Sequence, residues 1–332
     1  MQTRNYKFFG TIVLFFFILL VVSCQDAEES PYPAVQFQSK TTPTAVGRSS
    51  AVGFAIGDKG YVTLGRSGKN GGALVDCWEY NPSTDSWTQK MDFKGAARVN
   101  AIAEVINNQA YVGLGVQVGG SAYNSNVLLN DFWCFDPVAN TWTQKADYPD
   151  KAPNNCISFV ANAKIYAGFG FDGWNFTNRL WCYDPVQNTW KQMGETPLHK
   201  RFGAVACTDG EKVFIGTGFD TASKNDWWEY VPATDTWKQR CSLPYPGREN
   251  SVALAIGNRF FVSTGRYFHG PLTGGRLFSD LLEYDAVRNQ WYVRGEIPER
   301  ENAIAFTIAG KGYIGFGEND STVLNDLWSF EP

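Results

Sequence analysis

Hydrophobic and polar residues alternate along this chain in short runs that recur in a fixed order from residue 48 onward. A run of small and apolar residues comes first, a run ending in glycine follows, and a segment such as "DFWCFDPVANTW" completes the repeat. Alternation with a period of two predicts β-strands, and the turn residues between the runs predict hairpins. The first kind of segment begins at residues 48, 98, 154, 201, 248 and 300, the second at 61, 111, 166, 214, 261 and 313, and the third at 76, 131, 179, 226, 280 and 326.

The spacing of these repeats predicts the fold. The tryptophans that end the complete third segments are 55, 48, 47 and 54 residues apart: Trp87, Trp142, Trp190, Trp237 and Trp291. Each tryptophan opens a further run, so each repeat holds four strands. Four antiparallel strands repeated in this way are typical of propeller blades, with the tryptophans filling the space between neighbouring blades. We therefore expect an all-β, six-bladed β-propeller between residues 34 and 332.

The two ends of this region predict how the propeller closes. The sixth repeat stops at Pro332, one strand short, whereas the N-terminal segment "VQFQSK" resembles the fourth strand of the other repeats, with Phe37 in the place of tryptophan. Pairing this segment with Leu327–Phe330 completes the last blade and removes an exposed sheet edge. We expect the N-terminal strand to close the ring in this way.

The repeats resemble the Kelch motif, in which an arginine opens the first strand, an aromatic strand ends in glycines, and an aromatic-Asp-Pro turn precedes tryptophan. The resemblance covers residues 35–332. It departs from the usual double glycine, because here one residue separates the two, as in Gly168 and Gly170. We interpret such pairs as lying on one face of a strand where backbones approach closely. The stretch "GFGFDG" at 168–173 also matches a dinucleotide-binding pattern, but a strand follows it rather than a helix, so we expect no nucleotide site.

The N-terminus has the features of a bacterial export signal. Arg4 and Lys7 precede an apolar run from Phe8 to Val22, which is short for a membrane span. The sequence "VVSC" resembles a lipobox, which implies a signal peptide at residues 1–23, acylation of Cys24, and an acidic, proline-containing linker at residues 24–33. The acidic tract is similar to tracts that send Bacteroidetes-type lipoproteins to the cell surface. We expect an outer-membrane lipoprotein of the cell envelope, facing the periplasm or the surface and attached through lipid alone.

Charge and residue types exclude several kinds of chemistry. The net charge is −4, or −6 without Arg4 and Lys7, and no long basic run is present, so we expect no nucleic-acid partner. The two histidines, His199 and His269, lack the companions that a zinc site requires, so we expect no metal and no cofactor. Six cysteines follow Cys24 at unrelated repeat positions, which predicts mostly free, buried thiols.

The resemblance to Kelch propellers implies a binding site on one face, where the residues that open the first strand and those that follow the second strand meet. Carried onto this sequence, the first group is Ser49, Ser50, Asn100, Asn154, Asn155, Glu249, Asn250, Glu301 and Asn302, and the second is Arg66, Asp172, Trp174, Asp220, Arg266, Tyr267 and Glu318. Amides, carboxylates, arginines and aromatic rings in one pocket suit a carbohydrate or a peptide. The recurring arginines have a different role, because a residue that repeats in five blades anchors the fold: Arg48, Arg98, Arg201, Arg248 and Arg300.

Three functions are compatible with these patterns. The first is a monomeric, membrane-anchored Kelch-repeat protein that binds a glycan, a peptide or an envelope protein at the propeller mouth. The second is a periplasmic sugar mutarotase or epimerase of the sialic acid type, in which Glu249, Glu301 or Arg266 assists proton transfer at the anomeric centre. The third is a structural scaffold of a surface complex. A fold of this kind does not by itself decide among them.

Overall fold

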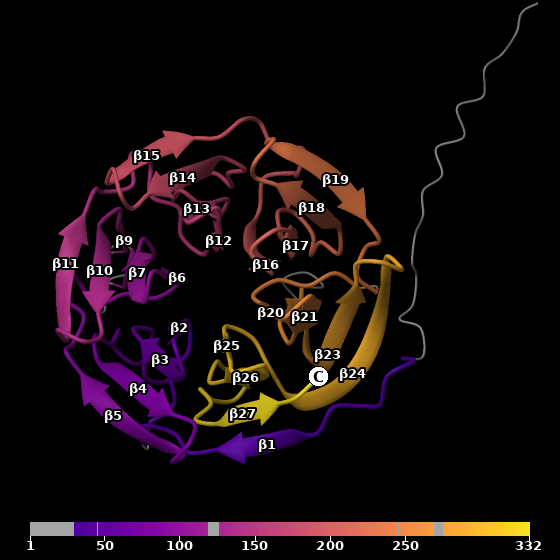
Figure 1. The fold of residues 1–332 in the computed structure, drawn as a ribbon, viewed down its shortest axis with the longest axis horizontal. Coiled ribbons are helices and arrows are strands. Elements are labelled where there is room, and N and C mark those ends of the chain that lie inside the picture. Colours follow the sequence, from indigo (N-terminus) through magenta and orange to yellow (C-terminus); the bar gives the residue numbers. More distant parts are fainter. Residues whose placement is uncertain (1–29, 45, 119–125, 245, 269–274) are drawn as a thin grey trace, which may run out of the picture.

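The computed structural model describes residues 30–332 except residues 45, 119–125, 245 and 269–274, and these residues form six antiparallel sheets around a central axis. The sheets are arranged like the blades of a wheel, and each presents its first strand to the axis (Figure 1). The sequence-based prediction of an all-β, six-bladed propeller is therefore confirmed. Along the described residues no helix is long and apolar enough to cross a membrane.

The strands of each blade follow one another outward from the axis. Blade 1 contains β2 (Val52–Ile56), β3 (Lys59–Thr63), β4 (Cys77–Asn81) and β5 (Ser86–Lys90); blade 2 contains β6 (Ile102–Ile106), β7 (Gln109–Gly113), β10 (Phe132–Asp136) and β11 (Thr141–Lys145), with the hairpin of β8 (Val116–Gln117) and β9 (Val127–Leu128). Blade 3 contains β12 (Ile157–Ala161), β13 (Lys164–Gly168), β14 (Leu180–Asp184) and β15 (Thr189–Gln192); blade 4 contains β16 (Phe202–Thr208), β17 (Val213–Phe219), β18 (Trp227–Val231) and β19 (Thr236–Arg240). Blade 5 contains β20 (Val252–Ile256), β21 (Arg259–Ser263), β22 (Arg266–Tyr267), β23 (Arg276–Asp285) and β24 (Gln290–Arg300). Blade 6 contains β25 (Ile304–Ile308), β26 (Lys311–Gly315), β27 (Leu327–Phe330) and β1 (Phe37–Lys40).

Blade 6 is assembled from both ends of the described chain, as predicted. β1 pairs antiparallel with β27, and Phe37 lies opposite Phe330 with ring centroids 5.3 Å apart. The indigo β1 lies along the outer edge of the yellow β27 in Figure 1. Because β1 supplies the missing outer strand, β27 has no open edge and the wheel is closed.

The alternation along the first strands explains the packing of the wheel. Large residues such as Phe54, Phe159 and Phe306 are buried between blades, whereas the residues that flank them in sequence are small and line the channel. Tryptophans of the outermost strands also connect blades. The Nε1–H of Trp142, for example, donates to the carbonyl of Met91 in the preceding blade at 3.0 Å. This contact confirms the predicted role of these tryptophans between blades.

The recurring arginines form buried clamps, which confirms their predicted structural role. In blade 2, Arg98 donates to both carboxylate oxygens of Asp131 at 2.6 and 2.7 Å and to the carbonyl of Leu114 at 3.1 Å. The same arrangement joins four further pairs: Arg48–Asp76, Arg201–Asp226, Arg248–Asp280 and Arg300–Asp326. Blade 3 reverses the charges, because Arg179 occupies the strand position of these aspartates and pairs with Asp150 at 2.8 Å.

The two glycines that follow each other with one residue between them are required for a different reason from the one predicted. Phe169, between Gly168 and Gly170, has a φ of 60°, and Gly170 has a φ of 92°, so the chain leaves the β conformation between the two glycines. The interpretation as two glycines on one face of a strand is therefore wrong, although the predicted close approach is right. A Cβ on Gly170 would lie 2.6 Å from the carbonyl oxygen of Asn154, so only glycine lets the second strand turn over the start of the first.

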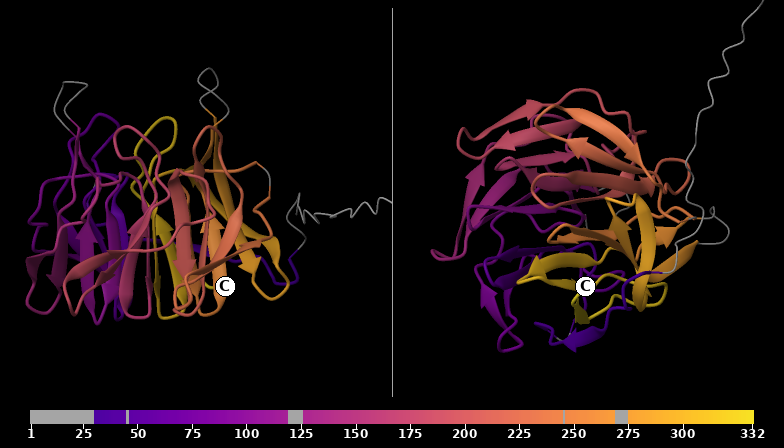
Figure 2. Two further views of the ribbon diagram at one scale, coloured as in Figure 1. Left: turned by 90° about the horizontal axis from the view of Figure 1, so that it is seen from above. Right: turned by 45° about the vertical axis from the view of Figure 1, so that its right-hand side comes forward.

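The connections divide the molecule into two ends. The loops that follow the second strands and the linkers that enter the first strands lie at one end, which we call the mouth, and the hairpin turns within each blade lie at the other. The left panel of Figure 2 shows the molecule from the side, with the yellow loop between β26 and β27 at the mouth. Five of the six cysteines after Cys24 have free thiols, which agrees with the prediction of mostly free thiols, and Cys241 is disulfide-bonded. The free ones are Cys77, Cys134, Cys156, Cys182 and Cys207.

Candidate functional site

A ring of backbone hydrogen bonds frames the mouth. One residue in each blade, at or just before the start of the first strand, has a left-handed backbone with φ between 53° and 62°; we call these the ring positions: Ser50, Asn100, Asn155, Gly203, Asn250 and Asn302. Five of the six amides donate to the carbonyl of the ring position in the preceding blade at 2.9–3.1 Å, and one of these bonds joins Ser50 to Asn302 across the closure. Asparagine and glycine tolerate this conformation well, which explains their recurrence.

Amide side chains of the ring reach across the mouth. Asn155 donates through Nδ2 to Oδ1 of Asn250 at 2.7 Å, although blade 4 lies between their blades. Gly203 makes this bridge possible, because a Cβ there would lie 2.6 Å from the same Oδ1. Asn250 then donates to Glu301 at 3.0 Å, and Asn302 donates to Glu318 at 3.1 Å. The structure therefore brings these predicted amides and carboxylates into one network.

Two further sets of residues surround the ring. The entry positions precede the ring positions directly, and the rim positions follow the second strand of the same blade and pair with the entry positions. The entry positions are Ser49, Val99, Asn154, Phe202, Glu249 and Glu301, and their rim partners, in the same order, are Arg66, Val116, Phe171, Phe219, Arg266 and Glu318.

One half of the mouth, formed by blades 5, 6 and 1, is charged. Arg266 donates through Nε to Glu301 at 2.7 Å and through Nη2 to Asp320 at 2.7 Å. Arg66 donates to both oxygens of Glu318 at 2.8 Å. Arg66, Arg266, Glu301 and Glu318 were predicted as site residues, and their ion pairs hold them in fixed positions at the mouth.

Glu249 differs from the other carboxylates of this half. Its side chain is buried, and Oε2 has no hydrogen-bond partner within the part of the chain that the structure describes. Burial and the negative charge of Glu301 raise the pKa of Glu249 to about 7, although Arg266 opposes the shift. A carboxyl group with this pKa exchanges a proton near neutral pH, which is the property of a general acid or base.

The other half of the mouth is apolar and aromatic, and the sequence analysis missed it. Phe176 packs on Phe202 and Phe219, with ring centroids 5.5 and 6.4 Å apart, and Phe219 packs on Phe268 at 5.4 Å. Phe171 completes this phenylalanine wall at 5.7 Å from Phe176. The signal was available, because phenylalanines occupy the rim position of blade 3 and both the entry and rim positions of blade 4, where blades 1, 5 and 6 have polar residues.

The remaining predicted residues have several local surroundings. Asp172 accepts the backbone N–H groups of Trp174 and Asn175 at 2.9 and 2.7 Å, so it shapes its own loop. Asp220 pairs with Lys224 at 2.7 Å and is turned into its loop as well. Tyr267 lies in β22, opposite Arg276. Trp174 is 82% exposed, and its indole is therefore available to a partner at the edge of the mouth.

The channel behind the mouth contains one acidic residue that the sequence analysis did not single out. A cavity of about 420 Å³ is lined by first strands of all six blades, and Glu104 accepts a hydrogen bond from Ser158 within it at 2.7 Å. Burial raises the pKa of Glu104 to about 7. Its position in β6 matches Phe54 in β2 and Phe159 in β12, so a carboxyl group replaces a large apolar residue here.

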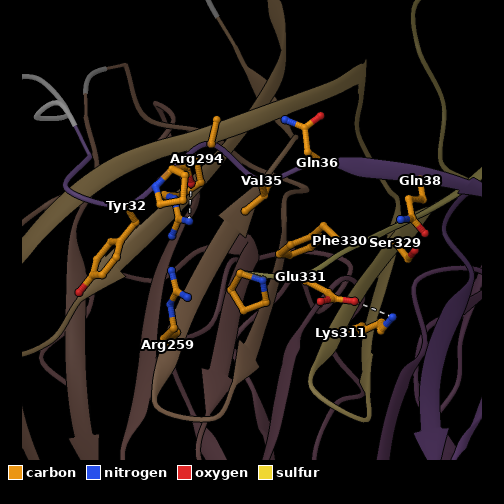
Figure 3. A pocket seen from close by; sticks show the side chains of 13 residues that line it. Tyr32, Val35, Gln36, Gln38, Arg259, Arg294, Lys311, Ser329, Phe330 and Glu331 are labelled. Carbon is orange, nitrogen blue, oxygen red and sulfur yellow. Dashed lines mark hydrogen bonds and ion pairs between the residues drawn. The ribbon is translucent and has the colours of Figure 1, made fainter.

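A second hollow, of about 380 Å³, lies at the seam where the N-terminal segment meets blades 5 and 6. Figure 3 shows Arg259 and Arg294 beside Tyr32, and the guanidinium carbons lie 5.0 and 5.3 Å from the centre of its ring. Both arginines also pair with Glu283, and Arg294 donates to the carbonyl of Pro33 at 2.8 Å. These contacts fix the N-terminal segment to blade 5, so this hollow serves attachment rather than recognition.

No group of three or more possible metal ligands occurs among the described residues. Two predicted features cannot be placed on this structure: the signal peptide with Cys24, and His269, lie outside the described residues. The mouth is therefore defined by its ring, its charged half and its phenylalanine wall.

Comparisons with known proteins agree with this geometry. The Kelch motif matches residues 118–147 and 165–197. The chain is 36% identical over 97 residues to a Kelch domain-containing protein of Vibrio cholerae, covering 29% of this chain and 26% of that protein. It is 29% identical over 133 residues to an N-acetylneuraminate epimerase of Pasteurella multocida, covering 39% of this chain and 33% of that protein.

These matches span only a third or less of each of the curated relatives, so they bear on the repeat and not on the whole of those proteins. A solved structure described as "Structure of YjhT" covers 88% of this chain and 99% of its own, with a TM-score of 0.73 and 19% sequence identity. At this identity the likeness shows the fold alone. The chain therefore contains two segments that match the Kelch motif, and it forms a six-bladed β-propeller.

Proposed function

We propose that this Kelch-repeat propeller binds a small glycan at its mouth. The observation that carries the proposal is the division of the mouth into a charged, amide-rich half and a phenylalanine wall. Sugars have hydroxyl groups that exchange hydrogen bonds with carboxylates, guanidinium groups and amides, and they have apolar faces that pack on aromatic rings. A peptide and an envelope protein are the alternative ligands for the same surface.

Saturation-transfer NMR with a panel of monosaccharides and short glycans tests this proposal. We expect saturable binding that falls at least about tenfold when Arg266→Ala removes a charged-half contact or Phe219→Ala removes part of the phenylalanine wall. Arg288→Ala is the matched control, because Arg288 is exposed and its ion pair with Asp285 lies at the opposite end. Binding of peptides but of no glycan would contradict the proposal.

A second function, sugar epimerisation or mutarotation, is favoured by Glu249. Opening a sugar hemiketal requires delivery of a proton to the ring oxygen and removal of a proton from the anomeric hydroxyl. A buried carboxyl with a pKa of about 7 is suited to this exchange, and a relative is an N-acetylneuraminate epimerase. Proton NMR of N-acetylneuraminate anomer exchange tests it, and acceleration that survives Glu249→Gln would exclude Glu249 from the reaction.

The proposed location is the cell envelope, with the propeller attached through acylated Cys24 and no other membrane contact. The lipobox-like sequence at residues 21–24 supports this proposal. Detergent-phase partitioning of the expressed protein tests it. We expect Cys24→Ala to release the propeller into the aqueous phase, and unchanged partitioning of that variant would contradict lipid attachment.

A further inference from the structure

The junctions between blades show a regular arrangement of side chains at the mouth. The rim position of one blade meets the entry position of the next, as in Arg266, which donates to Glu301 at 2.7 Å. At the next junction Ser49 donates to Glu318 at 3.0 Å. Polar groups at these two junctions therefore satisfy each other.

At three of the six junctions the rim position of one blade and the entry position of the next instead hold one polar and one apolar residue: Arg66 and Val99, Val116 and Asn154, and Phe219 and Glu249. Each of these polar residues has a buried atom without a hydrogen-bond partner among the described residues: Nε of Arg66, Oδ1 of Asn154 and Oε2 of Glu249. At each of these junctions the residue at the other position has no side-chain donor or acceptor.

The three atoms belong to blades 1, 3 and 5, so they alternate around the ring. One is a donor and two are acceptors, and buried polar groups of this kind are costly unless a partner satisfies them. A ligand that suits the mouth therefore offers one acceptor and two donors in different directions from a compact centre. A ring with several polar substituents has this property, and an extended chain does not.

The surroundings of Glu249 indicate which kind of donor group the ligand presents to it. Arg66 is neutralised by Glu318, and Arg266 is neutralised by Glu301 and Asp320. The charged groups that act on Glu249 are Arg266 and Glu301, and on the side of blade 4 the loop between β17 and β18 contributes the closed ion pair of Asp220 and Lys224. The carboxylate of Glu249 has no ion-pair partner of its own among the described residues. A hydroxyl group on a ligand is neutral, so it would leave the negative charge of this carboxylate uncompensated.

We infer that the ligand carries a protonated primary amino group, as a sugar with an unacetylated amine does, and that this ammonium is seated against Glu249. The inference rests on the proposed glycan-binding function and names the chemical class of the glycan. Hydroxyl groups of the same ring meet Arg66 and Asn154, and its apolar face packs on the phenylalanine wall. A charge-assisted bond is stronger than a neutral one, and it accounts for selection of an amine over a hydroxyl group.

Isothermal titration of the propeller with D-glucosamine, D-glucose and N-acetyl-D-glucosamine at pH 7 tests the inference. We expect glucosamine to bind on the order of tenfold more tightly than glucose or the acetylated sugar, and the preference to weaken in high salt. In Glu249→Gln the preference disappears while affinity for glucose is retained. Asp58→Asn is the matched control, since it removes an exposed acid at the opposite end, and it keeps the preference.

The outcomes separate the two levels of the proposal. Equal binding of the three sugars, or a preference that survives Glu249→Gln, overturns the ammonium site while leaving glycan binding in place. Absence of binding by these sugars and by the wider glycan panel overturns the proposed function itself. If Glu249→Gln folds poorly, the salt and pH dependence of the preference of the wild-type protein for glucosamine is the test. Tighter glucosamine binding as pH rises from 5.5 to 7 supports the ammonium site. A preference that depends on neither salt nor pH contradicts it.

Discussion

Two sets of residues around the axis, the clamp arginines and the entry positions, are adjacent in sequence but differ in how much they vary from blade to blade. The arginine clamps recur in five blades with the same partner type and nearly the same distances. The entry positions, one residue further along, range from serine through valine and phenylalanine to glutamate. Each clamp arginine pairs with a carboxylate of its own blade, although Nε of Arg48 and Nε of Arg248 have no partner among the described residues. At the entry positions, Oδ1 of Asn154 and Oε2 of Glu249 have no partner there either, and no ion pair joins either residue to its own blade.

This difference shows how a repeat protein separates stability from recognition. Five blades have the same clamp, and blade 3 has an ion pair of reversed charge, because all six blades share the same strand geometry. A ligand, in contrast, meets each blade in a different direction, so the residues that contact it diverge. Uniform positions therefore report on folding, and divergent positions next to them report on binding.

Breaking a clamp is expected to have the largest effect. Arg98→Ala leaves the partly buried carboxylate of Asp131 without its guanidinium, and we expect a loss of about 3–5 kcal/mol in the free energy of unfolding. Urea denaturation measures it. The control is Arg179→Ala in blade 3, whose charge-reversed pair with Asp150 is more exposed and should cost no more than about 1 kcal/mol. Equal losses in the two variants would contradict the distinction.

Replacing Glu249, one of the entry positions, is expected to have the next largest effect on the free energy of unfolding, and this effect depends on pH. The folded pKa of Glu249 is about 7, above its ordinary value, so its protonated form stabilises the fold and this contribution is lost as pH rises through 7. Relative to Glu249→Gln, the wild type should lose on the order of 2–3 kcal/mol between pH 4.5 and 8. Parallel stability curves for the two proteins would contradict the shifted pKa.

The amide bridge gives a smaller effect. Gly203→Ala places a methyl group against Asn250 and should cost about 1–2 kcal/mol, of which about 1 kcal/mol comes from the left-handed backbone. Gly57→Ala isolates the backbone cost, because Gly57 has a φ of 58° and no neighbour near the added carbon. Thermal unfolding compares the two variants. If both cost the same, the bridge contributes nothing measurable.

Trp174→Ala should have the smallest effect on stability, within about 0.5 kcal/mol, because its side chain is mostly exposed. Its effect on ligand binding sharpens the comparison between the clamp arginines and the entry positions. Weaker glycan binding with unchanged melting temperature would extend the recognition surface to the loop of blade 3. Unchanged binding would restrict that surface to the ring, entry and rim positions.

Much of the fold was predictable because the repeat displays it six times. The blade count, the pairing of β1 with β27 and the structural role of the arginines all follow from comparing repeats within one sequence. The charge reversal at Arg179 was harder to foresee, because its partner Asp150 lies outside the repeated pattern. The left-handed turn between paired glycines was missed, because spacing alone does not report backbone torsion.

The candidate site was predictable only as a set of positions. Arg266, Glu301 and Glu318 were identified from the resemblance, yet nothing in the sequence shows that Arg266 meets Glu301 of the next blade. Nor does it show that Asn155 reaches Asn250 across an intervening glycine. Such contacts depend on which side chains adjoining blades bring together, and the sequence alone does not show that Oε2 of Glu249 is left without a hydrogen-bond partner among the described residues.

The direction of β1 has a consequence for how the wheel is oriented. Tyr32 and Pro33 are held beside Arg259 and Lys311, which belong to hairpin turns remote from the mouth, and β1 then runs from Phe330 toward Leu327. A tether that precedes Tyr32 therefore leaves from the back of the wheel. With the proposed attachment through acylated Cys24, this arrangement would turn the back of the wheel toward the bilayer and the mouth away from it, so that the proposed glycan would approach without steric hindrance from the lipid surface.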